Sequence, residues 1–93
     1  MSSLEIKRDE KGFYVGNPSN KDAEITFVKK DEDTIDIDHT EVSENLQGQG
    51  VGGKLVQAVV DYARENNLNI TATCPYAEKK LSRTDEYLDV FVG

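Results

Sequence analysis

The stretch LQGQGVGGKL, residues 46–55, carries the glycines Gly48, Gly50, Gly52 and Gly53 directly before an apolar segment with helical spacing. Glycines in such a loop remove the side chains that would hold an anion away from the backbone amides. Amides at the start of a helix lack helical partners and lie at the positive end of the helix dipole, which favours a phosphate. The loop therefore predicts a phosphate-binding site, against the alternative of a structural turn that needs positive φ angles.

Two familiar phosphate-binding patterns fit this loop only in part. The P-loop pattern G-x-x-x-x-G-K-[ST] is met by Gly48, Gly53 and Lys54, but Leu55 occupies the last position, whose hydroxyl binds magnesium. The dinucleotide pattern G-x-G-x-x-G also matches, but it needs an acidic residue at the end of the next strand. Residues 69–74 contain no acid. Both nucleotide-binding folds are therefore excluded.

A third pattern, [QR]-x-x-G-x-[GA], is met in full by Gln47, Gly50 and Gly52. This hexapeptide resembles the pyrophosphate-binding signature of the GNAT superfamily of acyl-CoA-dependent N-acetyltransferases. In that superfamily the signature lies between a bulged antiparallel strand and a long amphipathic helix, and the resemblance extends over about residues 23–81.

The C-terminal part of the chain is similar to a small, minimal GNAT-like family. The resemblance rests on Cys74-Pro75-Tyr76 and on a tail that contains Arg83 and Glu86-Tyr87. Thr84-Asp85 departs from the pattern, because a His-Pro-like pair is expected there.

The resemblance implies that acetyl-CoA is the cosubstrate, with no metal. It implies that Val42 and Ser43 pair with the pantetheine like an added strand, and that the glycine loop holds the pyrophosphate. The loop positions are Gln47, Gly48, Gln49, Gly50, Val51, Gly52 and Gly53. Lys79, with Lys54, Lys80 and Arg83, is a candidate source of positive charge for the anionic cofactor, against the alternative that each is an ordinary surface cation.

The same resemblance makes Cys74 a candidate nucleophile for the acetyl group, with His39 as its base. A thiolate at Cys74 is favoured by the start of a helix at Pro75. The alternatives are a buried thiol that packs as a small hydrophobe and a core or edge histidine. In many GNAT enzymes an acid acts through water as the general base for the amine. The matching position here is Asp36, with Glu41 second, and either residue also fits a solvent-facing strand position.

The elements that must position these residues follow from the hydrophobic pattern. We expect an α+β fold of GNAT-like type, with four N-terminal antiparallel strands, a long helix, a fifth strand and a C-terminal helical segment. The two strands that flank the long helix are expected to lie parallel, as crossovers normally require. The expected strands are 4–8, 13–15, 23–30, 34–42 and 69–74. The first expected helix is 50–66 and ends at Asn66 and Asn67, and the second is 76–81 and begins at Pro75. A last helical piece is expected to carry Tyr87, Leu88 and Phe91, with Ser82 or Thr84 as its cap.

The apolar face changes sides within the fourth strand. Ile35 and Ile37 occupy odd positions, whereas Val42 and Leu46 occupy even ones. Because side chains alternate along a strand, this slip predicts a β-bulge near residues 39–41, unless the strand simply ends near Asp38.

Composition limits the class of protein. The 93 residues are expected to form one domain, 1–93, and a net charge of −7 argues against nucleic-acid binding. One cysteine rules out an internal disulfide, and the chain has neither a leader pattern nor an apolar run long enough for a membrane span, so a cytoplasmic protein is expected.

The acceptor is an unidentified amine or partner protein. Only residues 16–22 connect the second and third strands, where GNAT enzymes carry two helices that wall the acceptor site. A non-catalytic acyl-CoA-binding, sensing or protein-interaction module is therefore the competing hypothesis.

Overall fold

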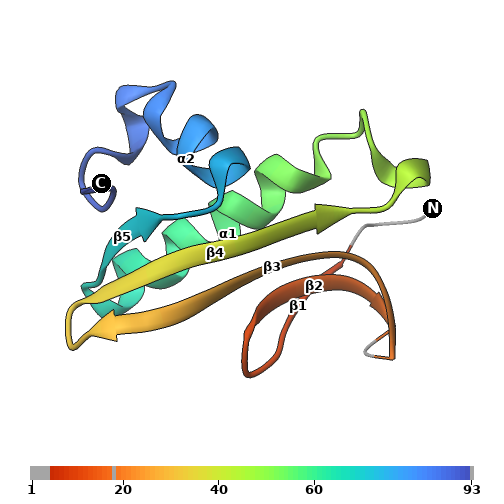
Figure 1. The fold of residues 1–93 in the computed structure, drawn as a ribbon, viewed down its shortest axis with the longest axis horizontal. Coiled ribbons are helices and arrows are strands. Elements are labelled where there is room, and N and C mark those ends of the chain that lie inside the picture. The colour runs from red at the N-terminus through yellow and green to blue at the C-terminus, as the bar shows by residue number, and fades with distance from the viewer. Residues whose placement is uncertain (1–4, 18, 93) are drawn as a thin grey trace.

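A computed structural model of the chain describes residues 5–17 and 19–92 (Figure 1). A single sheet has the strand order β1-β2-β3-β4-β5, in which the first four strands are antiparallel and β5 pairs with β4 in parallel. The strands are β1 (Ile6–Arg8), β2 (Gly12–Asn17), β3 (Asn20–Asp31), β4 (Thr34–Val42) and β5 (Asn69–Ala72). The predicted strand order and the parallel pair are confirmed, while Leu4, the predicted start of the first strand, lies outside the described residues.

The long helix α1 (Val51–Asn66) covers one face of the sheet (Figure 1). Most of its apolar residues are buried, and Leu55 and Val59 are 0% exposed. Phe13, Phe27 and Tyr62 close one end of this layer with ring centroids 5.4–6.4 Å apart. Burial of this stripe is the main force that holds the helix, because most helical stability in proteins comes from packing an amphipathic face. Asn67 ends the helix in the left-handed conformation at φ 55°, as predicted.

The bulge in β4 lies at Asp38. Thr26 pairs with His39 and Phe27 pairs with Ile37, so Asp38 is the extra residue on its strand. The bulge comes one residue before the predicted window of 39–41. Its position is fixed by a hydrogen bond from Thr26 Oγ1 to Asp38 Oδ1 at 2.7 Å, which turns the extra side chain toward solvent. Beyond the bulge the even-numbered residues face α1, which explains the change in apolar parity.

The C-terminal part departs from the predicted helix. The helix α2 (Pro75–Ser82) begins at Pro75, and the 3₁₀ helix η2 (Asp85–Tyr87) is capped by Thr84, whose Oγ1 accepts a hydrogen bond from the Glu86 amide. Phe91 is not helical: it forms a parallel bridge with Ile70. The prediction was wrong there because the outer edge of β5 has backbone N–H and C=O groups that need hydrogen-bond partners. Residues 90–92 lie beside this edge, and the Ile70 amide donates to the Val90 carbonyl at 2.7 Å.

No helix within the described residues combines the length and apolar composition that a membrane crossing requires. The 3₁₀ helix η1 (Glu44–Leu46) and the glycine loop connect β4 to α1.

Candidate functional site

A cleft opens where β4 and β5 separate. The two strands pair from Thr34↔Asn69 to Ile37↔Ala72, and the Thr73 and Cys74 amides then both donate to the Ile37 carbonyl. Beyond this point β4 continues alone into the bulge, and α2 forms the opposite wall. The cleft has a volume of about 490 Å³ and is lined by Thr40, Val42, Leu46, Gln47, Gly48, Gly50, Val51, Gly52, Tyr76 and Lys80.

The backbone of β4 presents alternate residues to this cleft. The Ser43 amide donates to the Asp22 carbonyl at 2.8 Å, so these two opposed residues form a hydrogen-bonded pair. Hydrogen-bonded and non-hydrogen-bonded pairs alternate along an antiparallel ladder. The N–H and C=O groups of Thr40 and Val42, which oppose Ile25 and Ala23, therefore point away from β3 and toward the cleft.

Ser43 does not share this orientation, contrary to its predicted role. Its amide is bonded to Asp22, and its carbonyl accepts a hydrogen bond from the Leu46 amide at 3.0 Å. The strand edge that is open to a ligand is therefore Thr40 to Val42. The side chain of Gln47 caps this edge, because Gln47 Nε2 donates to the Val42 carbonyl at 3.2 Å.

The glycine loop forms the end of the cleft at the start of α1. Gly48 and Gly50 have φ angles of 86° and 74°, a region that other residues enter only with strain, and Gly50 is the N-cap of the helix. A Cβ atom at Gly48, Gly50 or Gly53 would meet no atom within 4 Å. The space that these glycines leave open lies outside the protein core, where an anion can reach the helix N-terminus.

Gly52 differs from the other three glycines because it lies against a side chain. A Cβ atom at this position would overlap Tyr76 Oη, so the Tyr76 side chain would have to move. Glycine there lets α1 and the first turn of α2 approach, and this contact closes the cleft on the α2 side.

Positive charge at the cleft comes from Lys80 and not from the predicted Lys79. Lys80 is half-buried, and its Nζ lies 5.6 Å from the centre of the Tyr76 ring, whereas Lys79 is exposed and is not among the lining residues. Lys80 also borders a second pocket of about 190 Å³, which Gly53, Arg83 and Tyr87 help to line. The two pockets are adjacent through this shared side chain.

Cys74 lies against Thr40, which lines the cleft, although Cys74 itself is not among the lining residues. Cys74 is buried at 7% exposure, and its Sγ lies 3.5 Å from Thr40 Oγ1. Tyr76, two residues further on, borders the cleft. Partial burial raises the pKa of the Tyr76 hydroxyl above its ordinary value, and the nearby Cys74 adds to the shift. The phenol therefore stays protonated at neutral pH and can donate a proton.

His39 lies on the other side of the sheet from Cys74. Thr40 faces α1, so its neighbour His39 points from the opposite face, where its Nε2 lies 3.5 Å from Glu41 Oε1. The predicted pairing of Cys74 with His39 is therefore not formed in this structure, because consecutive strand residues face opposite ways.

Asp36 is buried at 8% exposure, and it too points away from α1. Its two carboxylate oxygens accept hydrogen bonds of 2.7 Å from the hydroxyls of Thr71 and Thr73. These two hydrogen bonds connect β4 to β5 and to Thr73, which lies just beyond the end of β5. Asp36 is not among the residues that line the cleft, so its geometry fits an anchor better than the predicted base.

The cleft also contains Thr40, Leu46 and Tyr76, which were not predicted as site residues, and Lys80, which was predicted only as one of four candidate cations. The signal for Tyr76 was present in the Cys-Pro-Tyr segment, and the parity slip placed Thr40 on the same face as Val42. Lys80 could not be separated from Lys79 by sequence alone, because only the rotation of α2 decides which of two adjacent lysines faces the cleft.

Comparisons with known proteins identify the family and support the fold. Residues 12–90 match the family model described as GCN5-related N-acetyl-transferase. The solution structure of a GCN5-like protein from Staphylococcus aureus is 53% identical, superimposes with a TM-score of 0.85 and covers 100% of this chain and 92% of its own.

Vertebrate proteins named NATD1 are more distant relatives. The Xenopus tropicalis protein is 30% identical over 93 residues, which cover 95% of this chain and 85% of the relative. The Danio rerio protein is 32% identical over 79 residues, which cover 82% of this chain and 72% of the relative. With its family match, its bulged strand and its glycine loop at a helix N-terminus, the chain belongs to the GCN5-related N-acetyltransferase family.

Proposed function

We propose that the cleft binds acetyl-CoA and that the chain transfers the acetyl group to an amine. The observation that carries this proposal is the edge of β4 beyond the bulge. The N–H and C=O groups of Thr40 and Val42 face the cleft with the periodicity of a strand, and pantetheine has amide groups that pair with such an edge.

The two ends of the cofactor have matching environments. The pyrophosphate binds at Gln47 to Gly53, where glycines expose the amides at the start of α1. The second pocket follows directly, and we assign the adenosine and its 3′-phosphate to it. Arg83 and Lys80 supply positive charge there, and Tyr87 offers an aromatic face.

The thioester then lies near Cys74, Thr40 and Tyr76. In the route through Cys74, the thiol attacks the acetyl carbonyl carbon, the bond from that carbon to the coenzyme A sulfur breaks, and the thiol proton passes to the departing sulfur. An amine then attacks the acetyl-cysteine and returns a proton to the Cys74 sulfur. The cleft provides two hydroxyl groups for this chemistry: Thr40 Oγ1, which lies 3.5 Å from Cys74 Sγ, and the protonated hydroxyl of Tyr76.

A non-catalytic acyl-CoA-binding module is the second candidate. One observation favours it: Asn17 pairs with Asn20, so β3 follows β2 within three residues, and the described residues between these strands form no helix that encloses an acceptor. This hypothesis keeps the cofactor site and removes the transfer step.

Binding is tested by isothermal titration calorimetry with acetyl-CoA. Gly53→Asp places a negative charge in the first turn of α1, which favours the helix but repels phosphate. We expect acetyl-CoA affinity to fall by about tenfold or more, which corresponds to about 1.4 kcal/mol. Gly53→Asn is the matched control, because asparagine has the size of aspartate without its charge; its affinity is expected to be about tenfold or more above that of Gly53→Asp. Equal affinity in all three proteins contradicts the proposed phosphate site.

Transfer is tested by intact-mass spectrometry after incubation with acetyl-CoA, with and without a panel of primary amines. An acetyl adduct that is absent from Cys74→Ala supports the covalent route. Acetylated amine that persists in Cys74→Ala supports direct transfer. Retained binding with neither product supports the non-catalytic module.

A further inference from the structure

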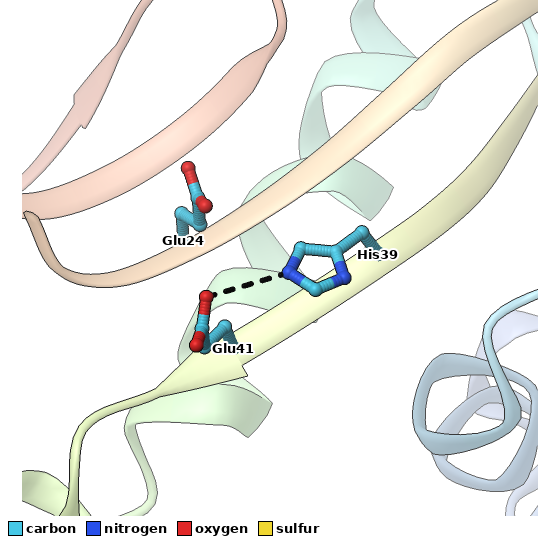
Figure 2. A group of neighbouring side chains, drawn as sticks. All are labelled: Glu24, His39 and Glu41. Atoms are coloured by element: carbon cyan, nitrogen blue, oxygen red, sulfur yellow. Dashed lines mark ion pairs between the residues drawn. The ribbon is translucent and has the colours of Figure 1, made fainter.

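The sheet face opposite α1 carries a group of side chains that the cleft does not use (Figure 2). Glu24 extends from β3, and His39 and Glu41 extend from β4. One oxygen of each carboxylate and one ring nitrogen of the histidine all lie within 4.8 Å of one another. We name this group the outer-face triad.

The register of the two strands brings the triad together. Glu24 lies directly opposite Glu41, and His39 opposes the neighbouring Thr26. His39 and Glu41 are two residues apart on one strand, so their side chains share a face. This arrangement fixes the three ligand-bearing positions by backbone pairing and not by mobile loops.

The spacing is close to that of a coordination shell. Ligands at 2.0–2.2 Å in a tetrahedral site are separated by about 3.4 Å. His39 Nε2 already lies 3.5 Å from Glu41 Oε1. The Glu24 carboxylate has to approach by about an ångström, which rotation of its side chain can supply.

The charges of the triad also favour a cation. Glutamates directly opposite each other on neighbouring strands repel and destabilise the pair. Lys21 relieves this only in part: its Nζ lies 2.8 Å from Asp9 Oδ2 and 3.5 Å from Glu24 Oε1, so its closer partner is Asp9. Glu41 is largely exposed, and its ion-pair partner is His39.

We propose that the outer-face triad binds a first-row divalent transition metal ion, of the Zn²⁺ class, through His39 Nε2 and one oxygen each of Glu24 and Glu41. An imidazole ligand favours such ions over Mg²⁺ and Ca²⁺, which prefer oxygen alone. Water completes the shell, because the His39 and Glu41 side chains are 54% and 70% exposed. The ion ties β3 to the part of β4 beyond the bulge. This proposal does not rest on acyl-CoA binding.

The test uses the full chain and Zn²⁺ alone, measured by calorimetry and by NMR. We expect one equivalent to bind and to shift the His39 imidazole and the amides of Glu24 and Glu41. His39→Ala and Glu41→Gln are each expected to weaken binding by at least about tenfold, since even the loss of a group that only supports a metal ligand costs that much. Both positions are exposed, so the variants should fold.

Glu65→Gln is the matched control, since it removes an exposed acid from α1, on the other face of the sheet, and should leave Zn²⁺ affinity unchanged. Mg²⁺ at the same concentration should leave the His39 resonances in place. The proposal is overturned if the triad variants bind Zn²⁺ as the wild type does, if Glu65→Gln weakens binding equally, or if the shifts centre on Cys74.

Discussion

The two halves of β4 are built for different tasks. Before the bulge, residues 34–37 pair with β3 on one edge and with β5 on the other, and Ile37 is 0% exposed. After the bulge, residues 39–42 pair only with β3 among the described strands, and their other edge borders the cleft. Thr40 and Val42 are half-buried there.

The difference shows how one inserted residue divides a strand into a structural and a functional part. The first half is paired with a strand on both edges, so it contributes stability and presents no open edge to a ligand. The second half keeps the same strand geometry but has backbone groups directed at open space. Asp38 marks the boundary between the two, and substitutions on either side should have separable effects.

The largest effect is expected from Ile37→Ala in the first half. Truncation of a fully buried isoleucine costs about 2–5 kcal/mol, through lost burial and the cavity left behind. Val42→Ala in the second half should cost clearly less, because Val42 is only partly buried. Urea denaturation of both variants measures the two costs. Similar losses at the two positions contradict the division of the strand.

Asp36→Ala is expected to follow in size. It leaves the hydroxyls of Thr71 and Thr73 without their acceptor, at a cost of about 1–3 kcal/mol. Asp38→Ala is the matched change after the bulge, and it should cost less because that side chain is exposed. Thermal unfolding compares them. If Asp36→Ala is as stable as the wild type but inactive in acetyl transfer, Asp36 is a catalytic base and not an anchor.

A smaller effect on stability is expected from Gly52→Ala. The new Cβ displaces the Tyr76 ring, while the helix gains up to about 1 kcal/mol from the better helix former. Stability should change little, whereas the Tyr76 ring resonances should shift and acetyl-CoA binding should weaken. Gly53→Ala should leave the ring resonances unchanged, and a shift of equal size there would argue against the Gly52 contact as the cause.

The smallest effect on stability is expected from Tyr76, which lines the cleft opposite the second half of β4. Its pKa is raised in the folded chain, so the folded state keeps the phenol proton to a higher pH than the unfolded state does. The stability that this proton contributes is fully present below the ordinary pKa of 10.0 and is lost as the pH rises through the raised value. Absorbance titration of the wild type and of Tyr76→Phe should show that the variant lacks a late-titrating phenol. If the phenol missing from Tyr76→Phe is instead one that titrates near the ordinary pKa of 10.0, the hydroxyl of Tyr76 is not buried enough to raise its pKa.

The sequence predicted most of the fold because its signals were local. The β4 bounds and the end of α1 at Asn66 and Asn67 follow from apolar periodicity and helix-stop chemistry. The bulge at Asp38 shifts the apolar residues of β4 from odd to even positions, and this shift predicted the place of the bulge to within one residue. Phe91 was misassigned because its strand-like bridge to Ile70 depends on an exposed edge that the sequence does not mark.

The site was predicted less completely, because side-chain direction depends on tertiary geometry. The loop at Gln47 to Gly52 was identifiable from glycine spacing, and the Thr40–Cys74 contact requires two segments distant in sequence. The sequence is compatible with a His39–Cys74 pair, but side chains alternate along β4, so His39 lies on the face of the sheet opposite Cys74. The outer-face triad depends in the same way on the register of β3 and β4, which no spacing in the sequence encodes.

The central claim is that acetyl-CoA binds along the second half of β4 and the glycine loop. An amide-resolved NMR titration of the full chain with acetyl-CoA tests this most directly. We predict that the amides of Thr40, Val42 and Gln47 to Gly53 shift with a single binding curve, while those of Ile35 and Glu24 remain in place. Shifts confined to the first half of β4 or to the outer face, with the glycine loop unperturbed, would contradict the claim.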